Sequence, residues 1–286
     1  MEQGMLFDMA HGSFTDGPGV RTVVFFKGCN LKCKWCHNPE SKSAASQMIF
    51  YENKCTGCGI CKEVCPKKGE SCDLCGVCTR YCPSSAKKIC GKMRTAEEVM
   101  QEIIKDEMFY KKSNGGVTFS GGECMLQIDF LKTLLKECRK AGIHTAVDTA
   151  GNVPWENFLK VLPYTDMFLY DVKCFTKELH TEGTGVGNER ILENLKRLSE
   201  HFEGDIIIRI PIIPGFNTDD DELCKMSEFL KNIKCKDIEL LPYHRLGENK
   251  YAAIHEEVTT YSVPSKEETE RMEMKFLEAV NRHKLQ

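Results

Sequence analysis

The chain has 286 residues, of which 41% are hydrophobic and 28% charged, and its formal net charge is −3. These values are typical of an ordinary soluble domain and indicate neither a nucleic-acid partner nor a membrane partner. The first residues lack a basic segment followed by an apolar one, so no signal peptide is expected.

Cysteine is unusually frequent, with 17 residues, and eleven of these fall into three short motifs. Such clusters favour metal ligation over disulfides. Free metal-binding thiols indicate a reducing compartment. We therefore expect a cytoplasmic protein.

The first predicted strand covers residues 23–26, and the first cysteine motif follows it. Cys29, Cys33 and Cys36 have the spacing C-x3-C-x2-C. A [4Fe–4S] cluster normally takes four cysteines, so three thiolates leave one iron free to bind a cofactor. The alternative is a structural zinc site, which usually draws two ligand pairs a dozen or more residues apart.

This motif, with the aromatic Trp35 before its last cysteine, resembles the radical S-adenosylmethionine (SAM) superfamily. Two flanking segments, residues 16–21 (DGPGVR) and 37–40 (HNPE), narrow the resemblance to the activating enzymes of glycyl radical enzymes. The resemblance implies a catalytic cluster on Cys29, Cys33 and Cys36, with SAM bound at its free iron and Trp35 at the cofactor site.

Residues 51–90 differ in composition from the rest, because cysteine, lysine and glycine dominate and apolar periodicity disappears. Two runs here read C-x2-C-x2-C-x3-C-P, the bacterial ferredoxin pattern, and predict two [4Fe–4S] clusters. In such proteins the fourth cysteine of each run serves the other cluster. The expected ligand sets are therefore Cys55, Cys58, Cys61 and Cys82 for one cluster, and Cys72, Cys75, Cys78 and Cys65 for the other. Only six residues separate Cys65 from Cys72, which is short for a two-cluster ferredoxin. With few bulky apolar residues, this segment is expected to depend on its metal for stability.

Strands and helices alternate after residue 90. Strands are predicted over residues 116–119, 143–148, 166–171, 206–210 and 236–241. Helices are predicted over residues 95–110, 128–141, from 154 onward, 188–201, 219–231 and 265–282. With residues 23–26 this gives six strands, too few to close an eight-stranded TIM barrel. We expect an α/β fold, a partial (β/α)6 barrel of the radical SAM type formed by residues 1–50 and 91–286, with residues 51–90 as a ferredoxin-like insert.

Glycines and a carboxylate follow the second of these strands. Gly121 and Gly122 let a ligand approach the backbone closely, and Glu123 stands beside them. In the family this motif binds the amino group of SAM. The alternative is a tight turn before a helix.

The next two strands also end in polar residues, Asp148 and Thr149 on one and Asp171 and Lys173 on the other. In similar activases these residues surround the carboxylate of SAM, in some with a monovalent cation between them. The alternative is that Asp171 and Lys173 form a buried structural pair.

Three further residues complete the expected site. Arg209 lies within an otherwise apolar strand, where a lone charge is costly unless paired, and we expect it near the SAM carboxylate or the incoming peptide. The resemblance places His244 at the SAM site or the active-site mouth, although it could equally be a surface histidine. Asp16 is expected to contact the partner protein, with a simple turn role as the alternative.

The resemblance implies an oxidoreductase that cleaves SAM reductively to a 5′-deoxyadenosyl radical and takes a hydrogen atom from a glycine α-carbon of a partner glycyl radical enzyme. Flavodoxin or ferredoxin is the expected electron donor, and a monomer is expected. Two alternatives stay open: a radical SAM enzyme that modifies another peptide or a small molecule, and a ferredoxin-type electron carrier.

Overall fold

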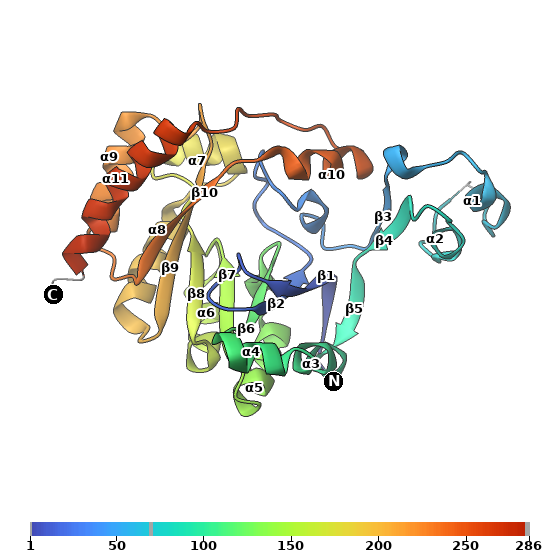
Figure 1. Ribbon diagram of the computed structural model, residues 1–286, viewed down its shortest axis with the longest axis horizontal. Helices are drawn as coiled ribbons and strands as arrows, with labels where there is room; N and C mark the ends of the chain where they lie inside the picture. Colours follow the sequence, from blue (N-terminus) through green and yellow to red (C-terminus); the bar gives the residue numbers. More distant parts are fainter. Residues whose placement is uncertain (1, 69–70, 284–286) are drawn as a thin grey trace.

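The computed structural model describes residues 2–68 and 71–283. Its main element is an eight-stranded sheet in the order β10-β9-β8-β7-β6-β2-β1-β5 (Figure 1). Six neighbouring strands run parallel: β2 (Arg21–Phe26), β6 (Gly116–Gly121), β7 (His144–Thr149), β8 (Met167–Asp171), β9 (Asp205–Ile212) and β10 (Asp237–Pro242). These are the six predicted strands, so the prediction of a parallel α/β sheet is confirmed.

Two antiparallel strands at the edge were not predicted. β1 (Gln3–Ser13) pairs with β2 on one side and with β5 (Lys92–Thr95) on the other. Only Gly4 and Leu6 are buried in β1. A strand so exposed carries little of the apolar signal from which strands are predicted.

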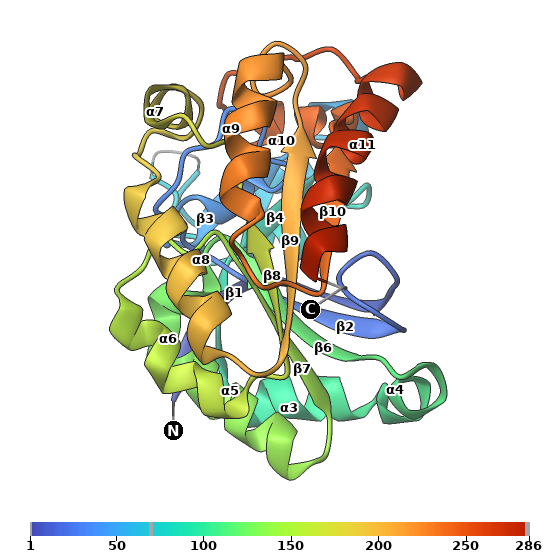
Figure 2. The ribbon, with the colours of Figure 1, turned by 90° about the vertical axis from the view of Figure 1, so that its left-hand side faces the viewer.

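Helices lie along the outer side of the curved sheet (Figure 2). They are α3 (Ala96–Ile104), α4 (Glu107–Ser113), α5 (Ile128–Lys140), α6 (Trp155–Val161), α7 (Lys177–Thr184), α8 (Glu189–His201), α9 (Asp220–Leu230) and α11 (Lys266–His283). Short 3-10 turns are η1 (Pro39–Ser41), η2 (Glu52–Lys54), η3 (Cys124–Gln127), η4 (Leu162–Tyr164) and η5 (Arg245–Gly247). A further helix, α10 (Glu248–Ala253), packs instead against two of the short turns, η1 and η5 (Figure 1). No helix in the described ranges is long and apolar enough to cross a bilayer.

The prediction of a single helix over residues 95–110 is wrong, because the helix is interrupted between α3 and α4. Asp106 has non-helical backbone angles (φ −97°, ψ 7°). Its carboxylate accepts hydrogen bonds from Thr22 Oγ1 and His11 Nδ1, both at 2.5 Å. The side chain is thus drawn toward β1 and β2, and the helix restarts in a new direction.

Residues 51–90 extend beyond a small antiparallel sheet of β3 (Gln47–Phe50) and β4 (Lys87–Cys90). Figure 1 shows this lobe, with α1 (Ile60–Glu63) and α2 (Val77–Arg80), projecting away from the main sheet. Within the described part of 51–90 only Ala86 and Cys90 are buried. The lobe therefore lacks a hydrophobic core of its own.

The two faces of the main sheet have different characters. The outer face packs against the helices through large buried side chains such as Phe119, Phe168 and Leu195. On the inner face, Ala146, Met167, Leu169 and Ile207 form a small apolar cluster. Because side chains two positions apart share a face, the next inward residues on β7, β8 and β9 are Asp148, Asp171 and Arg209. A polar layer thus lies above an apolar one.

Candidate active site

A cavity of about 510 Å³ opens at the carboxyl ends of the parallel strands. It is lined by almost all site residues predicted for the barrel: Asp16, Cys29, Cys33, Trp35, Cys36, Gly121, Gly122, Asp148, Thr149, Asp171, Lys173, Arg209 and His244. Open α/β sheets bind ligands at this end of their strands. The fold therefore brings distant parts of the sequence to one place.

The loop that carries the three cysteines is held on both sides by backbone hydrogen bonds. Gly28 N donates to Ser41 O (2.7 Å), and Cys29 N to Lys42 O (3.1 Å). On the other side Lys32 N donates to Thr184 O (2.7 Å) at the end of α7. The loop is therefore fixed before any ligand binds.

The thiols of this loop are mostly buried. Burial raises the pKa of Cys29 to about 12 and that of Cys33 to about 11, and it also raises the pKa of Cys36. Buried thiols of this kind need a metal to become thiolates at neutral pH. Leu31 N already donates to Cys29 Sγ (3.4 Å). Three thiols bordering one cavity fit a group of the size of a [4Fe–4S] cluster, whereas no three His, Cys, Asp or Glu side chains of the described chain converge on a single-ion site.

Trp35 is buried beside the cysteines. Its ring packs on Phe216, with centroids 4.4 Å apart, and lies edge-on to Tyr261 at 6.2 Å. A side chain at Gly183 would collide with both Phe216 and Trp35. The ring therefore has one fixed position in the wall of the cavity.

Gly121 and Gly122 are required by the backbone itself. Gly121 has φ +114°, and a Cβ there would lie 2.3 Å from Phe26 O. A Cβ at Gly122 would lie 2.3 Å from Gly28 O. The end of β6 and the start of the cysteine loop thus touch, and only glycine permits this contact.

Glu123 is the one predicted barrel residue outside the cavity lining. Its carboxylate is 1% exposed and accepts hydrogen bonds from Thr149 Oγ1 (2.8 Å), Ala150 N (3.1 Å) and Met125 N (3.2 Å). Burial raises its pKa to about 7. The side chain holds the end of β7 in place, and its predicted contact with an amino group stays a prediction.

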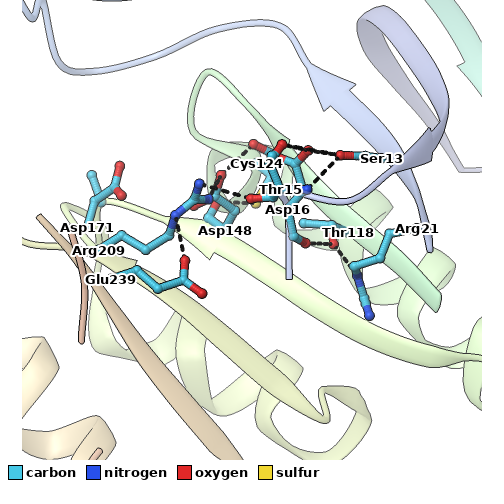
Figure 3. Close-up of polar contacts among 12 residues, drawn as sticks. Ser13, Thr15, Asp16, Arg21, Thr118, Cys124, Asp148, Asp171, Arg209 and Glu239 are labelled. Atoms are coloured by element: carbon cyan, nitrogen blue, oxygen red, sulfur yellow. Dashed lines mark hydrogen bonds and ion pairs between the residues drawn. The ribbon is translucent and has the colours of Figure 1, made fainter. Parts of the chain in front are cut away.

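Charged residues form a row across three neighbouring strands. Asp171 on β8 pairs in register with Arg209 on β9, which pairs with Glu239 on β10. Arg209 lies 3.5 Å from Asp148 and 3.7 Å from Glu239. Figure 3 shows its side chain between these carboxylates. The predicted need of Arg209 for a partner is thus met by carboxylates on both sides.

The charged groups of this row alter one another's pKa values. Burial raises the pKa of Asp148 to about 6, although Arg209 opposes the shift. Burial alone would lower the pKa of Arg209, but Asp148 and Asp171 raise it. Lys173 lies 2.9 Å from Asp171. Burial is the largest effect on its pKa and lowers it, but Asp171, Cys33 and Asp148 together raise the pKa above its usual value. Both cations therefore remain charged inside the cavity.

His244 stacks on His37, with ring centroids 4.0 Å apart. His37 Nε2 also bonds to the backbone oxygen of His244 at 3.0 Å. Burial and then the neighbouring His244 lower the pKa of His37. The segment after β10 is thereby fastened to the cysteine loop.

The loop that carries Asp16 is tied to the sheet (Figure 3). The carboxylate of Asp16 accepts a hydrogen bond from Ser13 Oγ, and the backbone oxygen of Asp16 accepts one from Thr118 Oγ1 at 2.7 Å. The buried Arg21 donates from Nε to Thr118 Oγ1 (2.7 Å) and from Nη1 to Pro18 O (3.2 Å). Asp16 therefore lies at the cavity in a loop fixed by hydrogen bonds to the sheet. A simple turn would not need these bonds.

Sequence reasoning missed several residues of the site. Ser120 donates to Asp148 Oδ2 (2.6 Å), Thr15 O accepts from Arg209 Nη2 (3.4 Å), and Glu239 contacts Arg209. Strand alternation could have found Ser120 and Glu239, because each lies inward on its strand. Thr15 offers no such signal, since it depends on a loop crossing to β9.

The cysteines of residues 51–90 do not line this cavity. The two cysteine runs of that segment have similar local structures. Gly59 and Gly76 have φ +78° and +76° and precede α1 and α2, which carry Cys61 and Cys78. Burial raises the pKa of Cys78, and nearby thiols of Cys72, Cys61 and Cys65 add to it. Two cysteines of the first run, Cys61 and Cys65, thus lie near Cys78 of the second run.

Comparison with known proteins gives a consistent result. The Radical SAM superfamily matches residues 23–227. The trans-4-hydroxy-L-proline dehydratase activating enzyme of Clostridioides difficile is 42% identical over 95% of this chain and 95% of its own length. The choline trimethylamine-lyase activating enzyme of Oleidesulfovibrio alaskensis is 42% identical over 87% of this chain and 86% of its length. A radical SAM methyltransferase from Sphaerobacter thermophilus shares the fold, with a TM-score of 0.61, 13% identity and coverage of 98% of this chain and 74% of that one.

The open parallel sheet, with three cysteines at the mouth of its cavity, defines a radical SAM enzyme. Glycines and charges beside the cysteines agree with this class. The chain belongs, within the radical SAM superfamily, to the activating enzymes of glycyl radical enzymes.

Proposed function

We propose that this chain activates a partner glycyl radical enzyme by abstracting a hydrogen atom from the α-carbon of one of its glycines. The observation that carries the proposal is the convergence of Cys29, Cys33 and Cys36 with a charged row on one cavity. When bound, a [4Fe–4S] cluster on the three thiolates with SAM at its free iron supplies reductive cleavage of SAM to a 5′-deoxyadenosyl radical.

The protein's own residues bind and orient. Lys173 and Arg209 offer positive charge to the carboxylate of SAM, and the backbone of Gly121 and Gly122, which lines the cavity, lets SAM approach closely. Trp35 and the strand ends exclude water on one side. Asp16 stands where the partner's glycine segment would enter.

A monovalent cation fits the charge balance of the site. Four carboxylates, those of Asp16, Asp148, Asp171 and Glu239, lie around Lys173 and Arg209. A carboxylate of SAM would add further negative charge. We propose that a cation such as sodium or potassium offsets it near Asp148 and Asp171.

We propose two further [4Fe–4S] clusters in residues 51–90, on the ligand sets expected from the sequence. The scarcity of buried side chains in the described part of this lobe supports its metal-dependent folding. The nearness of Cys65 to Cys78 is compatible with exchange of the fourth ligand between the runs. A flavodoxin or ferredoxin is the proposed electron donor, the chain is proposed to act as a cytoplasmic monomer, and the lobe relays electrons or docks the partner.

The activation itself is tested by electron paramagnetic resonance. Anaerobically reconstituted, reduced protein is mixed with SAM and with each of three candidate partners: trans-4-hydroxy-L-proline dehydratase, choline trimethylamine-lyase and 4-hydroxyphenylacetate decarboxylase. A glycyl doublet with one of them supports the proposal, and Cys33→Ser serves as the inactive control.

Other outcomes separate the alternatives. Cleavage of SAM with a modified product but no protein radical would indicate an enzyme that modifies a peptide or a small molecule. A protein that is reduced and oxidised but never cleaves SAM would be an electron carrier.

The role of the lobe needs its own test. The double variant Cys58→Ser/Cys75→Ser is compared with the wild type, once with dithionite and once with reduced flavodoxin. A relay predicts slow reduction by flavodoxin alone. Unchanged reduction with weaker partner binding indicates docking.

A further inference from the structure

Two large apolar side chains stand out by their exposure beside the cavity. Leu246 is 81% exposed and Phe14 is 76% exposed, more than any other large hydrophobic side chain of the described chain. Phe14 precedes Thr15, and Leu246 lies two residues after His244; both Thr15 and His244 line the cavity. The two side chains thus belong to the rim of the active site.

Phe14 is exposed on a loop that cannot easily fold it away. Ser13 Oγ, directly before it, donates to Asp16, and Thr15 O, directly after it, accepts from Arg209 Nη2 at 3.4 Å. Thr118 fixes the same loop through Asp16 O (2.7 Å). An aromatic ring held in water by such restraints leaves apolar surface that only another molecule can cover.

Leu246 is presented in a similar way. It lies in η5, two residues after His244. The backbone oxygen of His244 bonds to His37 Nε2 at 3.0 Å. Gly247 packs so closely on His37 that a Cβ would lie 3.0 Å from His37 Cα. Tyr243 OH donates to Glu248 Oε1 at 2.9 Å, which closes the turn on its other side. The turn is fixed, while its leucine points to solvent.

We infer that Phe14 and Leu246 grip the partner's glycine-bearing segment, an extended stretch with apolar side chains near the reactive glycine. The inference rests on the proposed function. A small molecule held within the cavity would not cover side chains on its rim, whereas a protein segment that enters the cavity passes over it. Continuity with the cavity therefore favours a protein segment as the occupant.

The test uses Phe14→Ser and Leu246→Ser in the full, cluster-loaded protein, with Leu159→Ser on α6 (Leu159 is 52% exposed) as the matched control. The partner is whichever of the three candidate enzymes the wild type activates best. We expect the apparent KM for the partner to rise about tenfold for each rim variant, with kcat at saturation unchanged, because each loses one buried apolar contact. Phe14→Leu should restore most of the affinity, and the control should behave as the wild type.

Cleavage of SAM without partner is measured in parallel and should be equal in all these proteins. An unchanged KM in both rim variants would overturn the inference, as would an equal loss of partner-free SAM cleavage, which would show a structural role. Sedimentation that shows a wild-type dimer lost in the variants would also overturn it, in favour of contact between copies. A wild type that cleaves SAM but gives no radical with any candidate contradicts the proposed function instead.

Discussion

The barrel and the lobe of residues 51–90 are built on different physical grounds. In β6 and β8 nearly every side chain is buried, and Val117, Phe119 and Phe168 are fully so. In the described part of the lobe only Ala86 and Cys90 are buried, while eight cysteines occupy its two runs. Burial of apolar area stabilises the first region, and metal ligation is proposed to stabilise the second. On this proposal, one chain combines two sources of stability.

Removal of iron should separate the two regions most clearly. After anaerobic chelation, we expect residues 51–86 to lose their protection from hydrogen exchange almost completely, because metal binding replaces a core there. β6, β7 and β8 should stay protected, since their packing needs no metal. Hydrogen exchange followed by mass spectrometry measures both. Simultaneous loss of protection in β6–β8 would contradict the division.

Truncation of one side chain in the barrel core should give the next largest effect. Phe168→Ala is expected to lower the free energy of unfolding by about 3–5 kcal/mol, since it leaves a cavity in a fully buried site. Tyr81→Ala in the lobe, where the side chain is 57% exposed, should change it by less than about 0.5 kcal/mol. Denaturant unfolding followed by near-ultraviolet circular dichroism compares them, and equal losses would refute the contrast.

The charged row tests whether polar groups in the barrel depend on protein partners rather than on metal. Arg209→Met leaves Asp148 and Glu239 without their shared cation, and we expect a loss of about 3 kcal/mol in unfolding free energy. The pKa of Asp148 should rise above its present value of about 6, because Arg209 is what lowers it. Infrared titration of the carboxyl band measures the pKa of Asp148. If Arg209→Met acted only by changing packing, this pKa would stay the same.

The smallest effect concerns pH. Glu123 has a pKa of about 7 in the folded protein, raised by burial from 4.5, so the folded state binds the proton more tightly than the unfolded state. Its contribution to stability is therefore full below about pH 4.5 and is lost as the pH rises toward 7, by about 1 kcal/mol per pH unit. Glu123→Gln should remove Glu123's share of the slope in thermal unfolding between pH 5 and 7 and leave the share of Asp148, whose pKa burial raises to about 6. Glu203→Gln on the surface should retain the whole slope. An unchanged slope in Glu123→Gln would show that another group causes it.

The sequence was sufficient to predict the elements that bury apolar surface. Runs such as residues 23–26 and 206–210 lie in β2 and β9, and the residues that end such strands reach one cavity because parallel strands share an edge. The spacing of Thr95 and Glu98 likewise fits the capping box that begins α3, in which Glu98 N donates to Thr95 Oγ1 at 3.2 Å. Local pattern thus predicted strands, their order along the chain and most of the cavity.

What the sequence could not predict depends on contacts between distant segments. β1 is held by pairing with β2 and β5 rather than by its own apolar pattern. The break at Asp106 comes from Thr22 and His11, which are far away in the chain. The placement of Glu123 behind the cavity wall likewise follows from Thr149 and Ala150. None of these has a signal in the spacing of nearby residues.

The β3–β4 hairpin brings the two ends of the lobe side by side, with Phe50 opposite Lys87. A segment whose ends already meet can be exchanged or excised as a cassette without pulling on the strands it leaves behind. Evolution could therefore add, duplicate or discard this lobe in a single step. An engineer could do the same with a short turn grafted between residues 50 and 87.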